Sequence, residues 1–231
     1  MVPSIHGTIM AEYFALAFDS TALRMSCGVE GIPIQSPRPA MSNTSAVSNP
    51  KPRLSKTVVL IGLMGAGKTS VGRKLAEMLG VEFVDADSEI EEAAGCTIAD
   101  FFERFGEEEF RRGEERVIAR LLKNPICVLA TGGGAYMSSD TRGKISDHGL
   151  SLWLKADLDV LYERVARRFG RPLLQTDDPR STLEGIMKVR YPVYAEADLI
   201  VQSYRGPIEK TVERAYQTII DYIAATNGTA Q

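Results

Sequence analysis

Residues 57–69 read Thr57-Val-Val-Leu-Ile-Gly-Leu-Met-Gly-Ala-Gly-Lys-Thr69, and this stretch decides the fold prediction. Its first five residues are apolar or β-branched and stop at Gly62, which is typical of a buried parallel strand. Its last eight residues fit the pattern Gly-x4-Gly-Lys-[Ser/Thr], a loop that connects a strand to a helix. Apolar residues then recur at helical spacing until Gly80, so we expect a helix from Ser70 to Leu79.

This loop is suited to hold the phosphates of a nucleotide, because its glycines let backbone N–H groups turn inward and the following helix points its positive end at them. We expect Lys68 to contact the β- and γ-phosphates and the hydroxyl of Thr69 to be a ligand of Mg²⁺. The nucleotide-binding residues predicted in the loop are Gly65, Ala66, Gly67, Lys68, Thr69 and Ser70. By itself the motif fits kinases, GTPases and ATPases equally.

Strands and helices continue to alternate along the chain, which predicts a parallel sheet covered on both faces. The predicted strands are Thr57–Ile61, Val81–Val84, Ile126–Ala130, Leu150–Leu154 and Asp198–Val201. The further predicted helices are Ser88–Ala94, Ile98–Phe105, Glu107–Leu122, Ser139–Ser146, Asp157–Arg167, Arg180–Tyr191 and Pro207–Ala225. The expected fold class is α/β, with three layers (α/β/α) and a five-stranded parallel sheet.

Composition excludes several classes of protein. With 27 Lys+Arg against 30 Asp+Glu, the 231-residue chain has a net charge of −3, whereas a duplex nucleic-acid binder normally has a basic surplus. No run of 18 apolar residues is present, so we expect no membrane-spanning segment. Cys27, Cys96 and Cys127 are widely spaced and odd in number, which favours a reducing compartment over a disulfide framework or a zinc site. We therefore expect a cytoplasmic protein.

The first 56 residues differ from the rest of the chain. Six of the 11 prolines lie before Thr57, and residues 36–52 are rich in Ser, Pro, Asn and Ala. Such a composition buries too little apolar area to offset chain entropy. We expect residues 1–56 to be disordered, or residues 1–40 to be an annotation artefact with translation starting at Met41. The folded domain is expected over residues 57–226, with a flexible tail at 227–231.

Two carboxylates, Asp85 and Asp87, follow the second predicted strand. In an extended segment alternate side chains share a side, so both can project into the crevice at the carboxyl ends of the strands. One carboxylate could hold Mg²⁺ through water while the other accepts a hydrogen bond from a substrate hydroxyl. The alternative is that Asp85 only ends the strand and that Asp87 caps a helix starting at Ser88.

Four further segments carry candidate chemistry, and each has a plainer alternative. Arg111 and Glu114 share a helix face, and the alternative is that this face is only a solvated, salt-bridged surface. Gly132–Gly134 suggest a ligand against bare backbone, and the alternative is a flexible turn. Residues 167–174 form a basic segment that could close over phosphate as a lid, and the alternative is an exposed loop. Arg190 ends a predicted helix, where it could instead satisfy the last carbonyl groups.

Together these segments resemble the shikimate kinase family, small P-loop kinases of the aromatic amino-acid pathway, over about residues 57–224. The motifs that carry the resemblance are Gly62–Thr69, Asp85-Ala86-Asp87, Glu109-Phe110-Arg111-Arg112-x-Glu114, Gly132-Gly133-Gly134, Arg171-Pro172-Leu173-Leu174 and Arg190-x-Pro192-x-Tyr194. The resemblance implies a P-loop fold of the nucleoside-monophosphate-kinase type. It also implies phosphorylation of the 3-hydroxyl of shikimate by ATP, with one Mg²⁺ ion as cofactor. We expect a monomer whose partners are these two small molecules.

The resemblance also implies a role for each matching position. Asp87 is similar to the residue that binds the hydroxyls and helps to deprotonate the attacking one, and Arg111 and Arg190 are similar to the clamp on the substrate carboxylate. The implied catalytic residues are Asp87, Lys68 and Arg171. The implied substrate-binding residues are Asp87, Arg111, Glu114, Gly132, Gly133, Gly134 and Arg190. ATP is expected to contact Arg167 and Arg171 besides the phosphate loop, and Mg²⁺ is expected at Thr69 and, through water, at Asp85.

Other readings of the sequence remain open. A related small-molecule kinase, such as a gluconate or nucleoside-monophosphate kinase, shares the phosphate loop, but the pair Arg111/Arg190 with the glycine loop favours a compact polyhydroxy acid over a planar base. A GTPase is disfavoured because the guanine motif Asn-Lys-x-Asp is absent from the sequence. A non-enzymatic regulator is disfavoured because all the charged substrate positions are present. The lid is short, with Phe169-Gly170 where other family members often have charged residues.

Overall fold

A five-stranded sheet forms the centre of the fold in the computed structural model, which describes residues 54–167 and 178–228. The strands are all parallel, in the order β2-β3-β1-β4-β5. Their bounds are β1 Thr57–Ile61, β2 Glu82–Asp85, β3 Cys127–Ala130, β4 Gly149–Lys155 and β5 Leu199–Gln202. The described residues belong to one unit that spans Pro52–Gln231. The predicted five-stranded parallel sheet is confirmed.

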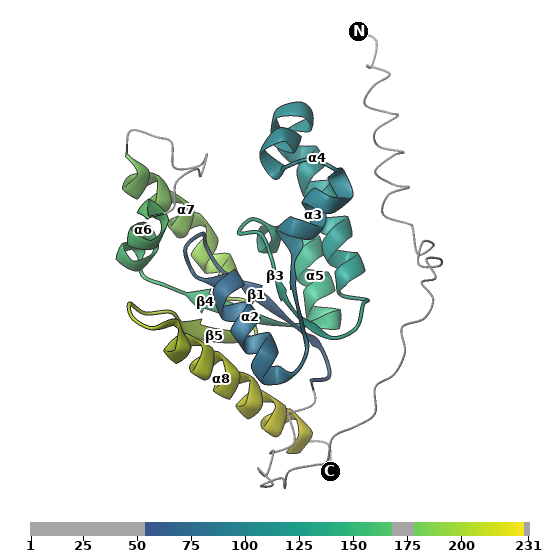
Figure 1. Cartoon of the computed structure of the whole chain (residues 1–231), viewed down its shortest axis with the longest axis vertical. Coiled ribbons are helices and arrows are strands. Elements are labelled where there is room, and N and C mark those ends of the chain that lie inside the picture. Colours follow the sequence, from purple (N-terminus) through teal and green to yellow (C-terminus); the bar gives the residue numbers. More distant parts are fainter. Residues whose placement is uncertain (1–53, 168–177, 229–231) are drawn as a thin grey trace, which may run out of the picture. The chain divides into compact units, whose positions relative to one another are not determined.

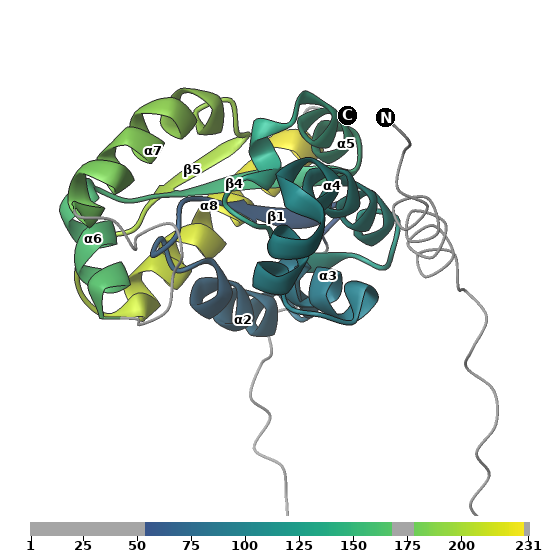
Figure 2. The ribbon, with the colours of Figure 1, turned by 90° about the horizontal axis from the view of Figure 1, so that it is seen from above.

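Helices cover both faces of this sheet (Figure 1). Their bounds are α2 Lys68–Leu79, α3 Ala86–Ala94, α4 Ile98–Leu121, the 3₁₀ turn η1 Ala135–Met137, α5 Ser139–His148, α6 Leu158–Ala166, α7 Pro179–Tyr194 and α8 Ile208–Gly228. Helix α2 packs with α8 against one face, and α5 packs on β4 and contacts α4 and η1. Figure 2 shows α2 and α8 on one side of the strands and α5 and α7 on the other. The three-layer prediction is therefore confirmed.

Strand β1 is central because it is apolar on both of its faces. Its residues are at most 2% exposed, and Val59 lies beside Leu129 of β3 and Ser151 of β4. A parallel strand covered by helices on both sides reads as an uninterrupted apolar run, and this run was visible in the sequence. Because all five strands point the same way, the loops that follow them gather at one edge of the sheet, where ligands bind in open α/β folds.

Several helix ends differ from the predicted ones by one to three residues, and those of α2 and α7 have a clear physical cause. Helix α2 begins at Lys68 rather than Ser70, because Gly67 takes a left-handed backbone conformation (φ 99°) directly before it. Helix α7 continues past the predicted end at Tyr191, although Pro192 lacks the N–H group that the helix interior uses. The last residue of α7, Tyr194, is completely buried. Its packing therefore outweighs the cost of a proline in the last turn.

Helix α4 joins the two helices that the sequence predicts around Gly106. The backbone of Gly106 is non-helical, with φ 79° and ψ 175°, so the predicted break at this residue is confirmed. A positive φ of this kind is readily adopted only by glycine. None of the helices in the described ranges has the length and hydropathy that a bilayer crossing requires.

Candidate functional site

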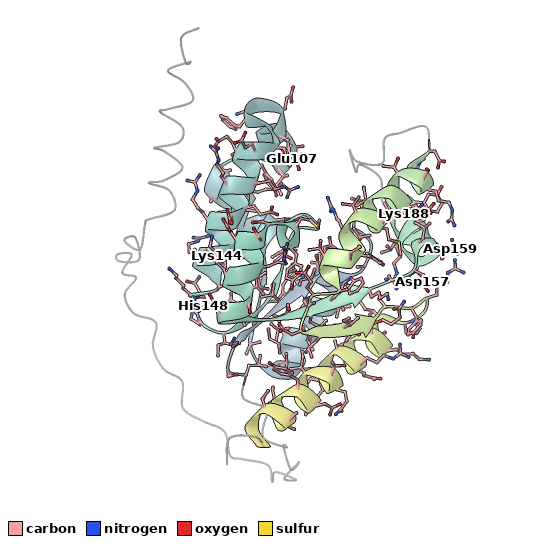
Figure 3. All side chains as sticks on the ribbon, turned by 180° about the vertical axis from the view of Figure 1, so that it is seen from behind. Glu107, Lys144, His148, Asp157, Asp159 and Lys188 are labelled. Atoms are coloured by element: carbon pink, nitrogen blue, oxygen red, sulfur yellow. The ribbon has the colours of Figure 1, made fainter. Side chains whose placement is uncertain are left out.

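A cleft of about 670 Å³ opens where the loops after the strands meet. The residues that line it come from the phosphate loop, the end of β2, helices α3, α4, α6 and α7, the loop after β3, and the segment after β5 with the start of α8. All the predicted site residues in the described ranges lie along this cleft. Arg171 and the lid segment 168–174 lie outside the described residues. Figure 3 shows Glu107 on α4 and Lys188 on α7, the two helices that bring arginines to the cleft from opposite sides.

The phosphate loop is built from backbone rather than side chains. Gly65 and Gly67 have φ of 81° and 99°, conformations that favour glycine. A Cβ on Gly65 would lie 2.8 Å from Val165 on α6, so this glycine is also required by helix packing. No side chain caps the start of α2, which leaves its first N–H groups available to an anion. Lys68 Nζ donates to Gly62 O at 2.8 Å, which holds the ammonium group over the loop.

Asp85 links the phosphate loop to the start of α3. Its Oδ2 accepts a hydrogen bond from Thr69 Oγ1 at 3.1 Å, and its Oδ1 accepts one from the backbone of Asp87 at 3.2 Å. Asp85 is therefore the residue that caps the helix, and the helix begins at Ala86. The alternative in which Asp87 caps a helix from Ser88 is wrong. The extended alternation proposed for the two carboxylates is also wrong, because Asp87 lies in the first turn of α3, yet both side chains line the cleft.

The oxygens of Thr69 and Asp85 are the protein groups that fit Mg²⁺ in this part of the cleft. Mg²⁺ prefers oxygen ligands and keeps several waters, so it needs only one or two protein groups beside nucleotide phosphates. Within the described ranges, no cluster of three or more His, Cys, Asp or Glu side chains has metal-binding geometry. The donor set therefore suits a metal that arrives with a nucleotide.

Arg111 and Glu114 form a half-buried ion pair on α4. Arg111 Nη1 donates to Glu114 Oε2 at 2.6 Å, and its Nη2 donates to Glu107 Oε1 at 3.1 Å. Burial raises the pKa of Glu114 above its usual range, the charge of Arg111 opposes that rise, and Asp87 adds to it. Burial lowers the pKa of Arg111, but its two glutamate partners raise it to a net value above the ordinary one. Glu114 is only 2% exposed, so the alternative of a solvated helix surface is wrong for this residue.

The glycine loop gives room to these charged side chains. A Cβ on Gly132 would lie 2.7 Å from Glu114 Oε1 and 2.9 Å from Asp87 Oδ1. A Cβ on Gly134 would lie 2.5 Å from Arg111 Nη1. The ligand that the sequence predicts against this bare backbone stays a prediction, and in the structure the protein's own side chains also approach Gly132 and Gly134 closely. The glycines therefore leave room for four charged side chains to meet. These are Asp87, Arg111, Glu114 and Arg190.

Arg190 reaches this loop from the other side of the cleft. Its Nη1 donates to Gly133 O at 2.9 Å, so the interpretation that it only satisfies carbonyls at the end of its own helix is wrong. Arg111 lies over Gly134 and Arg190 over Gly133, which brings the two guanidinium groups to neighbouring residues of one loop. Such a pair suits a carboxylate, because the planar fork of arginine binds two oxygens at once.

Arg164 is a part-buried residue of the cleft that the sequence analysis did not single out. Its Nη1 donates to Ser203 Oγ at 2.9 Å and to Gly65 O at 3.3 Å, and its Nη2 donates to Tyr204 O at 2.7 Å. Burial lowers the pKa of Arg164 below its ordinary value. The side chain thus ties the phosphate loop to the segment after β5. No sequence signal marked it, because its acceptors include backbone carbonyls far away in the chain.

Arg167 lines the outer part of the cleft. Its side chain is 74% exposed and forms an ion pair with Glu163 at 2.6 Å. An exposed pair of this kind has little stabilising value, so the guanidinium group is free to move. Its predicted contact with the base of ATP stays a prediction.

Comparisons with known proteins agree on one family. The shikimate kinase family model matches residues 64–221. A shikimate kinase of Paramagnetospirillum magneticum is 53% identical over 171 residues, covering 74% of this chain and 88% of the relative. A shikimate kinase of Ruegeria pomeroyi is 55% identical over 162 residues, covering 70% of this chain and 83% of the relative.

A solved structure from the same family is also similar to this chain. The shikimate kinase of Acinetobacter baumannii in complex with shikimate has a TM-score of 0.69 and 38% identity, covering 72% of this chain and 94% of that chain. A gluconokinase of Sinorhizobium meliloti has a TM-score of 0.57 at 19% identity, covering 78% of this chain and 100% of that chain. This likeness shows the fold alone.

Proposed function

The chain belongs to the shikimate kinase family, and from this premise we propose how its cleft carries out the reaction. The enzyme is a kinase that phosphorylates shikimate at the expense of ATP, in aromatic amino-acid biosynthesis. The γ-phosphoryl group passes to the 3-hydroxyl, giving shikimate 3-phosphate and ADP. The observation that carries this proposal is the convergence of Asp87, Arg111 and Arg190 on one glycine loop beside the phosphate loop.

ATP binds with its phosphates in the loop Gly65–Ser70. The backbone N–H groups and the start of α2 bind the β- and α-phosphates, and Lys68 exchanges its carbonyl partner Gly62 for phosphate oxygens. The hydroxyl of Thr69 and, through water, the carboxylate of Asp85 would hold Mg²⁺, which would supply positive charge to the phosphates. Arg167 contacts the nucleotide at the outer end of the cleft.

Shikimate binds through its carboxylate to Arg111 and Arg190. The Glu107 partner of Arg111 is 69% exposed, so this pair is weak and the substrate can replace it. Glu114 is buried and keeps holding the other side of the guanidinium group, which fixes the orientation of Arg111. The acceptor lies along Gly132–Gly134, where no side chain of the loop intervenes.

Asp87 accepts a hydrogen bond from the attacking hydroxyl and takes up its proton as the phosphoryl group is transferred. The geometry in support is the position of its carboxylate over Gly132, in the cleft that the phosphate loop also lines. Phosphoryl transfer depends mainly on alignment and on neutralising charge, so the enzyme needs little covalent chemistry of its own. Arg171 is proposed to contribute charge from the lid, whose closure excludes water as a competing acceptor.

The remaining parts of the proposal concern the enzyme's setting. We propose a monomeric cytoplasmic enzyme, since the two substrates bind within one chain and the composition suits a reducing compartment. No nucleic acid and no membrane take part.

The experiment that tests the function measures ATP consumption by the purified chain with and without shikimate. We expect turnover that depends on shikimate and on Mg²⁺, and little turnover with gluconate under the same conditions. Replacing ATP with GTP is expected to slow the reaction. Equal turnover with gluconate, or ATP hydrolysis unaffected by shikimate, would overturn the assigned acceptor.

A further inference from the structure

Helix α7 carries two tyrosines, Tyr191 and Tyr194, whose hydroxyl groups both donate to a backbone carbonyl of another element. Tyr191 donates to Ala156 O after β4, and Tyr194 donates to Gly133 O in the glycine loop. Burial raises the pKa of both phenols, that of Tyr191 to about 12, so both stay protonated donors near neutral pH. The two residues are chemically alike, but only Tyr194 reaches the acceptor side of the cleft.

The carbonyl of Gly133 accepts two hydrogen bonds from α7. One comes from Tyr194 and the other from Arg190 Nη1 at 2.9 Å. A carbonyl oxygen has two lone pairs, so these two donors saturate it and fix the direction of the peptide group. Gly133 stands between Gly132, which faces Asp87 and Glu114, and Gly134, which faces Arg111. The direction of this one peptide group therefore affects every charged group of the acceptor site.

The ring of Tyr194 is packed in the core. It is completely buried, and Trp153 and Tyr136 meet it edge-on, with ring centres 5.9 Å and 6.4 Å away. Helix α7 continues past Pro192 to place it there, despite the hydrogen bond that proline removes. A residue that only filled the core would not need a hydroxyl group aimed at Gly133.

We propose that Tyr194 is a positioning residue for the acceptor: its hydroxyl holds the Gly133 peptide, and thereby sets Arg190 and the bare backbone of the loop before shikimate binds. It acts through these groups and touches no substrate itself. The proposal rests on the proposed function and adds a residue whose role lies in the acceptor half alone.

The test compares Tyr194→Phe with Tyr191→Phe. Each variant removes one hydroxyl that donates to a backbone carbonyl and keeps the ring, so the two should lose similar amounts of thermal stability. We expect Tyr194→Phe to raise KM for shikimate about 5- to 10-fold, the scale of one lost hydrogen bond, and to change KM for ATP less than about 2-fold. Tyr191→Phe should change neither KM. Calorimetric titration of shikimate without ATP should show the same weakening.

Several outcomes would overturn the proposal. The first is an unchanged KM for shikimate in Tyr194→Phe, and the second is a KM for ATP that rises as much as the KM for shikimate. The third is an equal rise of KM for shikimate in Tyr191→Phe, which would show that the hydroxyl of Tyr194 is merely structural. A wild-type chain without shikimate-dependent turnover would instead remove the proposed function. Should Tyr194→Phe not fold, hydrogen exchange of the wild-type chain decides. The Ala135 amide, which donates to Gly132 O at 3.2 Å, should be protected before shikimate is added, and fast exchange would contradict a loop set in advance.

Discussion

The two halves of the cleft are built in different ways. The nucleotide half is a continuous run, residues 62–70, whose geometry lies in glycine backbone angles and in the start of α2. The acceptor half is assembled from side chains of α3, α4 and α7 that meet over the loop after β3. A site made of backbone needs few particular side chains, whereas a site made of side chains depends on how each one holds the next. Single substitutions should therefore have selective effects in the acceptor half.

Mutual support in the acceptor half can be followed from contact to contact. Glu114 holds Arg111, Arg111 covers Gly134, and Gly133 accepts from Arg190. Glu114 is buried and its charge is opposite to that of Arg111 and Arg190, so these arginines lower the cost of burying its carboxylate. We therefore expect substitutions in the acceptor half to impair the binding or turnover of shikimate and to leave ATP binding unchanged. The effect should be larger the closer the substituted group lies to the transferred proton.

The largest effect is expected for Asp87→Asn. The amide keeps the shape of the side chain but cannot take the proton of the attacking hydroxyl, so kcat should fall at least about 10²-fold, the usual scale of a general base. Affinity for ATP should stay nearly unchanged, because the phosphate loop is intact. Steady-state kinetics with equilibrium binding of ATP measures both.

The control for this prediction is Asp147→Asn, an exposed aspartate on α5. It makes the same chemical change away from the cleft and should leave kcat within about 2-fold. Near-normal turnover of Asp87→Asn would remove the proton-accepting role from Asp87. A loss of ATP affinity equal to the loss of turnover would show that the two halves are not separate.

The difference between the halves also explains what the sequence could predict. The strand, loop and helix at 57–79 follow from local patterns, and the structure moves the helix start by only two residues. The acceptor residues were candidates from the sequence itself, but their roles came from the family resemblance, and no local pattern could show that Gly134 leaves room for Arg111. Arg164 and Tyr194 were missed as functional residues, because their contacts are with backbone carbonyls about 40 to 100 residues away. Local propensity also failed at Pro192, where the burial of Tyr194 decides the end of the helix.

The second largest effect is expected for Gly134→Ala. Gly134 has φ −94° and ψ −20°, which alanine adopts without strain, so the backbone should accept the change. The new Cβ would lie 2.5–2.6 Å from the guanidinium group of Arg111, which must move aside. We expect KM for shikimate to rise about 10-fold or more, as for a misplaced substrate clamp, with KM for ATP nearly constant.

Gly143→Ala on α5 is the matched control, since nothing lies within 4 Å of its added Cβ. It should leave both KM values unchanged and raise thermal stability slightly, because alanine favours a helix. If Gly134→Ala binds shikimate normally, shikimate binding does not require the observed position of Arg111. The claim that the acceptor half depends on the packing of its side chains on one another would then be wrong.

Arg164→Lys tests whether the nucleotide half depends on a side chain outside the phosphate loop. A single ammonium group cannot reach Gly65 O, Ser203 Oγ and Tyr204 O together, so the link between the phosphate loop and the segment after β5 should loosen. We expect KM for ATP to rise about 3- to 10-fold and KM for shikimate to stay constant. Arg112→Lys, an exposed arginine paired with Glu108 and Glu109, serves as the control. A rise in KM for shikimate alone would contradict the division of the cleft.

The smallest effect is expected in the pH dependence of stability of Glu114→Gln. The pKa of Glu114 is raised in the folded chain, so between its unfolded and folded values the folded state binds more protons than the unfolded state. The contribution of Glu114 is therefore fully present below the unfolded pKa and decreases as the pH rises through the folded pKa. Glutamine does not titrate. The free energy of unfolding of the wild type, relative to the variant, should therefore fall as the pH rises above the unfolded pKa of Glu114.

Urea unfolding of both proteins at several pH values between 4 and 8 measures this difference. Arg111 and Arg190 favour the charged carboxylate, and burial and Asp87 disfavour it, so the sign of the slope shows which influence dominates. A difference that rises with pH would mean that the ion pair with Arg111 outweighs burial. Glu114 would then stabilise the fold as a charge, and the acceptor half would be held together by attraction more than by the packing of its side chains around the glycine loop.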